Sequence, residues 1–196
     1  MMSIDRKINR IQFLTGNSLK VIAALTMLID HLSKTVLQWL QSNYWWPMVD
    51  NGQMSRERFQ EIDYFIRFDL QSIGTIAFPL FCFLLAEGFQ HTRSKKRYIG
   101  LMLAFALISE IPFDILFLSF FSRMEGTFPF YLKYQNVLFT LFLGLLTLVC
   151  LERFSCKSDL PVDRIKSAVL QVLSVVLFSG IAEGIRCDGG MLGILF

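Results

Sequence analysis

The chain has 196 residues, of which 54% are hydrophobic, 14% aromatic and 18% charged, and its formal net charge is +3. A soluble domain carries about 25% charged residues, and a net charge this small gives no indication of a nucleic-acid partner. Together with a mean hydropathy of +0.49, the composition predicts a single all-α domain that lies in the lipid bilayer as a bundle of transmembrane helices.

Residues 1–18 are expected to form a separate basic amphipathic segment at the membrane surface. Isoleucines recur there at helical spacing with arginine and lysine between them, a pattern typical of helices that lie along the lipid headgroups. Residues 15–18 then break this segment, and Asn17 or Ser18 is expected to cap the helix that follows.

Five apolar runs predict helices that cross the bilayer, and a sixth run stops at the end of the chain. The runs are residues 19–40, 73–89, 100–121, 137–151, 167–185 and 191–196. A spanning helix needs about 20 residues, so the sixth run is either a truncated span or a short tail. We therefore expect a transmembrane domain over residues 19–196 with five to six spans, in a protein that continues past Phe196.

The basic residues predict the orientation of the bundle. Twelve of them lie around the N-terminus and in the loops after the second and fourth spans, against six on the opposite side. Because positively charged loops stay in the cytoplasm, the N-terminus is expected to be cytoplasmic and the protein to be a multi-pass protein of the inner membrane. Residues 41–72 would then form a long outer loop, with Tyr44, Trp45 and Trp46 at the interface.

A polar stripe runs down the first predicted span, with His31 at its middle. Asp30 and Lys34 flank His31, and Lys20 lies eleven residues upstream. At 100° per residue, eleven residues come within about 20° of three full turns, so Lys20 and His31 share a face, whereas Asp30 is expected to pair with another helix. Ionisable groups at this depth usually serve chemistry or transport; the alternative is a polar face that packs against sister helices.

A second polar group lies in the third predicted span. Glu110 and Asp114 are four residues apart and therefore share one helix face. Two carboxylates in an apolar setting can work as acid and base, or they can receive a lysine from the first span. The alternative is that Asp114 only caps the helix or extends to the surface.

Further polar residues lie at the ends of the predicted spans. Glu87 and His91 precede a basic run that is either a cytoplasmic anchor or a mouth for a polyanionic ligand. This run comprises Arg93, Lys95, Lys96 and Arg97. The amides of Gln135 and Asn136 are expected to bond across helices or to substrate, and Asp188 to lie in a polar turn. The cysteines and histidines form no ligand pattern, so no metal is expected.

Several of these motifs, in this order, resemble the TraX family over nearly the whole chain. They are Leu19–Ala23, Met27–His31, Ile73–Phe81, Glu87–Phe89, His91–Arg93, Ser109–Asp114, Gln135–Val137 and Asp188–Gly190. The family's named member is an inner-membrane protein that acetylates the N-terminus of a conjugative pilin. The resemblance therefore implies an inner-membrane protein. The family is similar to the acyltransferase-3 proteins and to heparan-alpha-glucosaminide N-acetyltransferase. In acyltransferase-3 proteins a basic residue, usually Arg, precedes an essential histidine by eleven positions, and Lys20 and His31 match that spacing.

The resemblance implies a transferase that moves an acyl group, expected to be acetyl, from cytoplasmic acyl-CoA to an amine or hydroxyl at the outer side. His31 is the expected general base, and Glu110 and Asp114 are the expected secondary acid–base or orienting groups. Lys20 and the basic run 93–97 are the expected contacts of the CoA phosphates. Lys20 lies about 16 Å along the helix from His31, which is of the order of a pantetheine arm.

The sequence leaves the acceptor and the rival classes open. A peptide N-terminus, a cell-envelope glycan and a lipid headgroup are all compatible acceptors, and acetyl-CoA or another acyl-CoA is the expected donor. A proton-coupled transporter or flippase would use the same buried histidine and carboxylates as a relay. A non-catalytic membrane scaffold would need these side chains only for packing.

Overall fold

The computed structural model describes residues 15–115, 134–156, 158 and 160–196. These residues are helical apart from turns and one β-bridge, which confirms the predicted all-α class. Most of the predicted interfacial segment and residues 116–121 of the third predicted span lie outside the described residues. The chain divides into two compact units, Met1–Leu84 and Leu85–Phe196, and each unit is described by itself.

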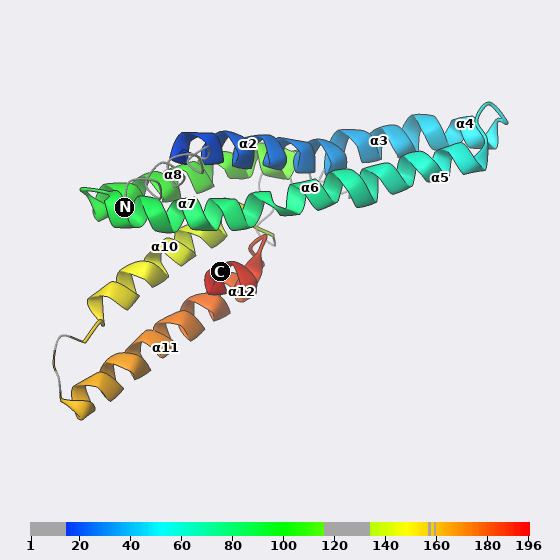
Figure 1. Cartoon of the computed structure of the whole chain (residues 1–196). Coiled ribbons are helices and arrows are strands. Elements are labelled where there is room, and N and C mark those ends of the chain that lie inside the picture. The colour runs from blue at the N-terminus through cyan, green and yellow to red at the C-terminus, as the bar shows by residue number, and fades with distance from the viewer. Residues whose placement is uncertain (1–14, 116–133, 157, 159) are drawn as a thin grey trace, which may run out of the picture. The chain divides into compact units, whose positions relative to one another are not determined.

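The first unit is an antiparallel hairpin of two helical arms (Figure 1). The first arm comprises α2 (Gly16–Leu32), a π-helical turn (Ser33–Leu37), α3 (Gln38–Leu40), a second π-helical turn (Gln41–Trp45) and α4 (Trp46–Asp50). The second arm comprises α5 (Arg56–Tyr64), a π-helical turn (Phe65–Leu70), α6 (Gln71–Thr75) and α7 (Ala77–His91), and α7 continues into the second unit.

The prediction of a long outer loop over residues 41–72 was wrong. These residues continue both helical arms, and the connection between the arms is limited to residues 51–55. Gly52 adopts a left-handed φ of 71° in this turn, a conformation that glycine takes without steric cost. The side chain of Ser55 then caps α5 by accepting a hydrogen bond from the backbone N–H of Arg58.

The start of the first arm also differs from the prediction. Thr15 caps α2, because its hydroxyl oxygen accepts a hydrogen bond of 3.2 Å from the backbone N–H of Ser18. Asn17 and Ser18, the predicted caps, lie within the first turn of the helix, since α2 begins at Gly16. A threonine with an extended backbone satisfies an orphan N–H of the first turn as well as the predicted residues would.

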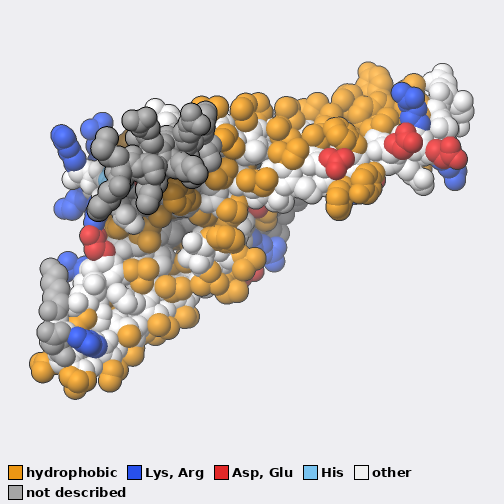
Figure 2. All heavy atoms as spheres, viewed as in Figure 1, with side chains coloured by type: hydrophobic (Ala, Val, Ile, Leu, Met, Phe, Trp, Pro, Cys, Tyr) orange, Lys and Arg blue, Asp and Glu red, His pale blue; other side chains and the backbone are white. Residues whose placement is uncertain are grey.

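Three helices among the described residues are long and apolar enough to cross a membrane, namely Gly16–Asp50, Arg56–His91 and Pro161–Gly184. They contain the first and second predicted spans and the fifth except for its last residue, Ile185. Each hairpin arm has 35 or 36 residues, or roughly 50 Å of helix, against a hydrocarbon core of about 30 Å. The arms are therefore longer than a crossing requires. Apolar side chains cover much of their surface, whereas charged side chains gather at the tip of the hairpin (Figure 2).

The second unit is built around α10. It contains α8 (Lys95–Phe113), α10 (Val137–Arg153), α11 (Pro161–Gly184) and the short α12 (Gly190–Leu195), and α10 packs against the other three. Leu143, Ala182 and Cys187 form a buried apolar cluster where these elements meet. The helix α8 overlaps the third predicted span, α10 contains the fourth, and the sixth apolar run forms most of α12.

The close approach of the two arms predicts that Gly74 in α6 tolerates no larger side chain. A Cβ at this position would lie 2.5 Å from the Cβ of Asp30 and closer still to its Oδ1. We expect Gly74→Ala to lower the free energy of unfolding by about 1–3 kcal/mol, the usual cost of overpacking. Thermal unfolding of the detergent-solubilised protein measures the effect.

The matched control is Gly180→Ala in α11, where a Cβ meets no atom within 4 Å. This variant is expected to hold or raise the melting temperature, because alanine loses less backbone entropy in a helix than glycine does. Equal melting temperatures for the two variants would contradict the close approach at Gly74.

Candidate functional site

His31 lies near the end of α2, on a stretch that is α-helical without interruption from Gly16 to Leu32. The regular helix keeps Lys20 and His31 in the predicted register, about 16 Å apart along the axis. The side chain of His31 is 36% exposed, and Lys20 is exposed. The first unit therefore presents a cation and an imidazole along one face of one helix.

A hydrogen bond from His31 to the backbone indicates the tautomer of its neutral ring. Nδ1 lies 2.9 Å from the carbonyl oxygen of Met27, one turn earlier. A carbonyl only accepts, so Nδ1 carries the proton and Nε2 carries the basic lone pair. The same Nδ1 lies 3.9 Å from Oδ2 of Asp30. In this arrangement a proton taken up by the ring enters at Nε2, and the resulting imidazolium has a carboxylate beside it.

Asp30 is buried at the contact between the arms, with 8% of the residue exposed. Its Oδ2 accepts a hydrogen bond of 2.9 Å from Nζ of Lys34. Its Oδ1 lies against Gly74 and has no hydrogen-bond partner among the described residues. The prediction that Asp30 pairs with another helix was therefore wrong for the ion pair. The carboxylate packs on the second arm, but its cation comes from its own helix.

A π-helical turn begins directly after the histidine region and alters the predicted stripe. The segment Ser33–Leu37 has the i→i+5 hydrogen bonding of a π-helix. This bonding widens the helix and rotates the residues that follow around its axis. The polar stripe predicted along the first span therefore keeps its α-helical register only as far as Leu32. The buried hydroxyls of Ser33 and Thr35 donate to the carbonyl oxygens of Asp30 and His31, at 2.8 and 2.5 Å. Single π-helical turns are frequent at functional sites.

Glu110 and Asn136 form the polar centre of the second unit. Glu110 is 8% exposed, and its Oε2 accepts hydrogen bonds from both the backbone N–H and the side-chain amide of Asn136. The same amide donates to the carbonyl oxygen of Ala106 at 2.9 Å. Oδ1 of Asn136 accepts from the N–H of Leu138 and caps α10. One asparagine thus joins α8 to the start of α10, as predicted for a residue that bonds across helices.

Asp114 is the C-cap residue of α8 and is 6% exposed. The alternative that this side chain extends to the surface is therefore wrong. Its burial next to Glu110 on the same helix end leaves two acidic side chains close together in a largely apolar unit, as the spacing of four residues predicts.

Gln135 and Asp188 come together through their backbones. The N–H of Gln135 donates to the carbonyl oxygen of Arg186 at 3.2 Å, and the N–H of Asp188 donates to the carbonyl oxygen of Gln135 at 2.9 Å. The hydroxyl of Tyr134 donates to Oδ1 of Asp188 at 3.3 Å, and the hydroxyl of Thr140 donates to its carbonyl oxygen. This short bridge fixes the chain ahead of α10 to the turn after α11.

The two glycines after Asp188 reverse the chain. Gly189 and Gly190 adopt φ values of 92° and 46°, in the left-handed region that favours glycine. A Cβ on Gly190 would lie 2.9 Å from Oε2 of Glu183, which accepts a hydrogen bond from the N–H of Met191. The Asp-Gly-Gly motif is thus explained by a tight polar turn, as the sequence predicts.

The basic run 93–97, predicted together with Lys20 to contact the CoA phosphates, lies between α7 and the first turn of α8. Nζ of Lys95 pairs with the carboxylate of Glu152 in α10 and lies 4.4 Å from the ring centroid of Phe89. Lys95 therefore has a structural role in the second unit. The other three basic residues of the run are exposed. Just before them in α7, Glu87 is half-buried and His91 is exposed.

The predicted site residues therefore fall into two local groups. The first unit holds Lys20, Asp30, His31 and Lys34, and the second holds Glu87, His91, Arg93, Lys95, Lys96, Arg97, Glu110, Asp114, Gln135, Asn136 and Asp188. The expectation that Glu110 or Asp114 orients His31 involves residues of both units, and it stays a prediction. Over the described ranges, no group of three or more His, Cys, Asp or Glu side chains is arranged to hold a metal ion.

Sequence reasoning missed residues that act through packing or through single hydroxyls. Gly74 carried a weak signal, since it is a glycine within an apolar run, but nothing in that run names Asp30 as its neighbour. Tyr134 and Thr140 bond to Asp188, which is about fifty residues away in sequence. Contacts over such separations are not readable from local spacing.

The fold and the buried polar groups define a helical membrane protein with ionisable side chains inside its apolar segments. The model of the TraX protein family matches residues 15–196, and the chain belongs to this family. The chain is also similar to the probable fimbrial assembly protein FimC, serogroup H1, of Dichelobacter nodosus, with 29% identity over 181 residues. That match covers 91% of this chain and 58% of the relative, so the chain spans less than two thirds of the relative's length. No solved structure matches the chain.

The junction at Asn136 predicts different costs for two substitutions. Asn136→Ser keeps a capping hydroxyl for α10 but removes the amide that donates to Glu110, and Asn136→Ala removes both. We expect a loss of about 1–3 kcal/mol for the serine variant, because a buried carboxylate oxygen keeps the backbone N–H of residue 136 but loses the side-chain donor, and about 1 kcal/mol more for alanine. Thermal unfolding in detergent compares the two. Equal stability of the serine variant and the unmodified chain would contradict the role of Asn136 as the donor to Glu110.

Burial predicts that Cys187 is chemically inert in the folded protein. The residue lies in the turn after α11, 5% exposed, and burial raises the pKa of its thiol to about 11. Only about one thiol in a thousand is ionised at pH 8 when the pKa is that high. A variant with Cys187 as its single cysteine is expected to react with maleimide slowly when folded and rapidly in denaturant. Rapid modification of the folded protein at pH 8 would show that this turn is open.

Proposed function

We propose that this protein is a membrane-embedded acyltransferase. It moves an acyl group, acetyl in the simplest case, from cytoplasmic acyl-CoA to an amine or hydroxyl acceptor at the outer side. The observation that carries the proposal is the arrangement of His31: its Nδ1–H is held by the Met27 carbonyl, which leaves the basic lone pair on Nε2. Lys20 lies three turns away on the same unbroken helix. The TraX family model matches residues 15–196, a range that includes every residue with a role in the proposed reaction.

In the proposed reaction His31 acts as the general base. Nε2 takes the proton from the acceptor amine or hydroxyl while its nitrogen or oxygen attacks the thioester carbonyl. The carbon–sulfur bond then breaks, and the departing CoA sulfur receives the proton from the imidazolium. Asp30, whose Oδ2 lies 3.9 Å from Nδ1, stabilises the transient imidazolium. Lys34 holds that carboxylate in place through their hydrogen bond of 2.9 Å.

Lys20 supplies the complementary charge for the donor. Its ammonium group is exposed at the start of the helix, and the anionic phosphates of CoA are attracted to such a cation. A lysine offers a point charge rather than the two-pronged fork of arginine, so we assign it attraction and not geometric recognition. The separation of about 16 Å from His31 suits a pantetheine arm that lies along the helix.

The relative's name supports a role for this protein in pilus-related processes at the membrane, because that relative is described as a probable fimbrial assembly protein. The compatible acceptors are then a peptide N-terminus, a cell-envelope glycan and a lipid headgroup.

The direct test is acyl transfer by the purified chain in nanodiscs. The protein is supplied with acetyl-CoA that carries a labelled acetyl group and with an envelope extract as the source of acceptor, and CoA release is followed by mass spectrometry. We expect His31→Ala and His31→Gln to reduce transfer by about 10²–10⁴-fold, the usual contribution of a general base. Thermal unfolding of both variants should stay close to that of the unmodified chain.

The control is Gln90→Ala, which changes an exposed residue of α7 outside the polar groups described above and should keep full activity. Full transfer by His31→Gln would overturn the assignment of the base. If the protein releases no CoA but moves protons across the membrane of proteoliposomes in a His31-dependent manner, it is a transporter and not a transferase.

A further inference from the structure

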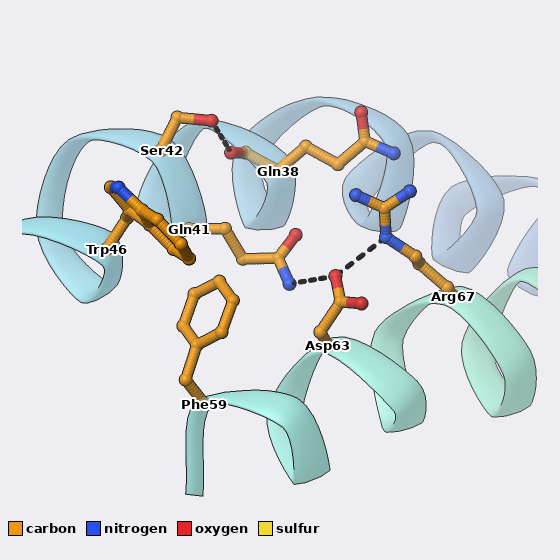
Figure 3. Close-up of a pocket in the computed structure, with 7 residues that line it drawn as sticks. All are labelled: Gln38, Gln41, Ser42, Trp46, Phe59, Asp63 and Arg67. Carbon is orange, nitrogen blue, oxygen red and sulfur yellow. Dashed lines mark hydrogen bonds and ion pairs between the residues drawn. The ribbon is translucent and has the colours of Figure 1, made fainter. Parts of the chain in front are cut away.

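The first unit contains an open groove near the tip of the hairpin, away from His31. Its volume is about 420 Å³, and seven side chains from both arms line it (Figure 3). They are Gln38, Gln41, Ser42 and Trp46 from the first arm and Phe59, Asp63 and Arg67 from the second. We call it the hairpin groove. Its volume lies within the range of about 300–1,000 Å³ that is typical of small-molecule sites.

The polar floor of the hairpin groove is fixed by hydrogen bonds between the arms. Gln41 is 5% exposed, and its Nε2 donates to Oδ1 of Asp63 at 2.9 Å. Nε of Arg67 donates to the same oxygen at 2.6 Å. The carboxylate is thus held from two sides, and Arg67, whose side chain is 63% exposed, keeps the outer part of its guanidinium accessible. In Figure 3 this guanidinium and the amide of Gln38 lie at the same end of the groove.

Two aromatic rings form the opposite end of the hairpin groove. Trp46 and Phe59 pack edge to face, with ring centroids 5.3 Å apart and an interplanar angle of 70°. Trp46 is 49% exposed, so part of its indole is available to a ligand. An indole offers a flat apolar face together with one N–H donor.

The sequences of both arms favour a position of the hairpin groove at the membrane–water interface over one in the hydrocarbon. Gln38 is eighteen residues beyond Lys20, or about 27 Å of helix, which is close to the thickness of the hydrocarbon core. On the second arm, residues 70–86 carry no charge, and Asp69 and Arg67 come directly before them. Trp39, Tyr44 and Trp45 around the groove are the residue types that gather at membrane interfaces.

We propose that the hairpin groove binds the ring of a saccharide. Planar amide, carboxylate and guanidinium groups at one end supply both donors and acceptors, which suits the adjacent hydroxyls of a sugar. The aromatic end suits the apolar C–H face of the same ring. Asp63 and Arg67 cancel each other's charge, so neither an anionic nor a cationic ligand gains a net attraction, and a neutral ring rich in hydroxyls is favoured.

The sugar has two physical sources, a soluble or envelope glycan and the headgroup of a glycolipid, and both present the same ring. The proposal is independent of acyl transfer, since none of the seven lining residues has a part in the proposed reaction.

Saturation-transfer difference NMR on the full chain in nanodiscs tests the proposal with methyl glucoside, methyl galactoside and N-acetylglucosamine as probes. We expect saturation of the ring C–H protons of at least one probe, and an affinity about tenfold lower in Trp46→Ala, which removes the aromatic face. The matched control Trp39→Ala removes an exposed indole of the same arm outside the groove and should leave binding unchanged.

Arg67→Gln changes an exposed side chain and serves as a second test should Trp46→Ala not fold; it too should weaken binding about tenfold. Inorganic phosphate should not displace the probe. Nanodiscs doped with glucosyl-diacylglycerol should compete if the source is a glycolipid and leave the signal intact if it is a free glycan. Absence of saturation for every probe, equal signals in Trp46→Ala and Trp39→Ala, or displacement by phosphate would overturn the proposal.

Discussion

The buried carboxylate of Asp30 imposes the main constraint on the first unit. A charge that is removed from water is costly unless a cation or donors compensate it, and Lys34 provides that compensation from the next turn. The carboxylate occupies the contact between the arms, so the residue that faces it has no room for a Cβ. This residue is Gly74. The packing of the arms, the ion pair and the environment of His31 are therefore consequences of one side chain.

The second unit meets a related constraint with a different residue. Glu110 is buried in α8, and here the compensation comes from the start of a neighbouring helix, where Asn136 donates from both its backbone and its side chain. A helix N-terminus has orphan N–H groups and a positive dipole end, so it is well suited to a carboxylate. Glu110 thus connects two helices by hydrogen bonds, and Asp30 determines how closely the two arms pack. The polar residues of the apolar spans are part of the architecture as well as of any chemistry.

Sequence patterns predicted the features that depend on composition and on local periodicity. The all-α class follows from the apolar runs, and the shared face of Lys20 and His31 follows from an α2 that is regular between them. The helical extension of both arms into residues 41–72 was missed, because apolar content identifies the part of a helix inside lipid and not where the helix ends. The π-helical turn after Leu32 was also missed, since no local propensity distinguishes i→i+5 from i→i+4 bonding.

Contacts between distant residues were the least accessible to sequence reasoning. The pairing of Lys95 with Glu152 joins residues 57 apart, so a lysine that reads as part of a free basic patch is engaged in the fold. The same reason explains why Asp30 was expected to find its cation on another helix: spacing gives the direction of a side chain but not the identity of its neighbours.

The proposed role of His31 as general base depends on the proton position in its neutral ring, and ¹⁵N NMR measures that position directly. In protein labelled at its two histidines, with His91→Gln used to assign the resonances, the neutral ring of His31 should show a protonated Nδ1 and an unprotonated Nε2. A neutral ring with its proton on Nε2 would leave no basic lone pair at that nitrogen, and it would contradict the assignment of His31 as the base.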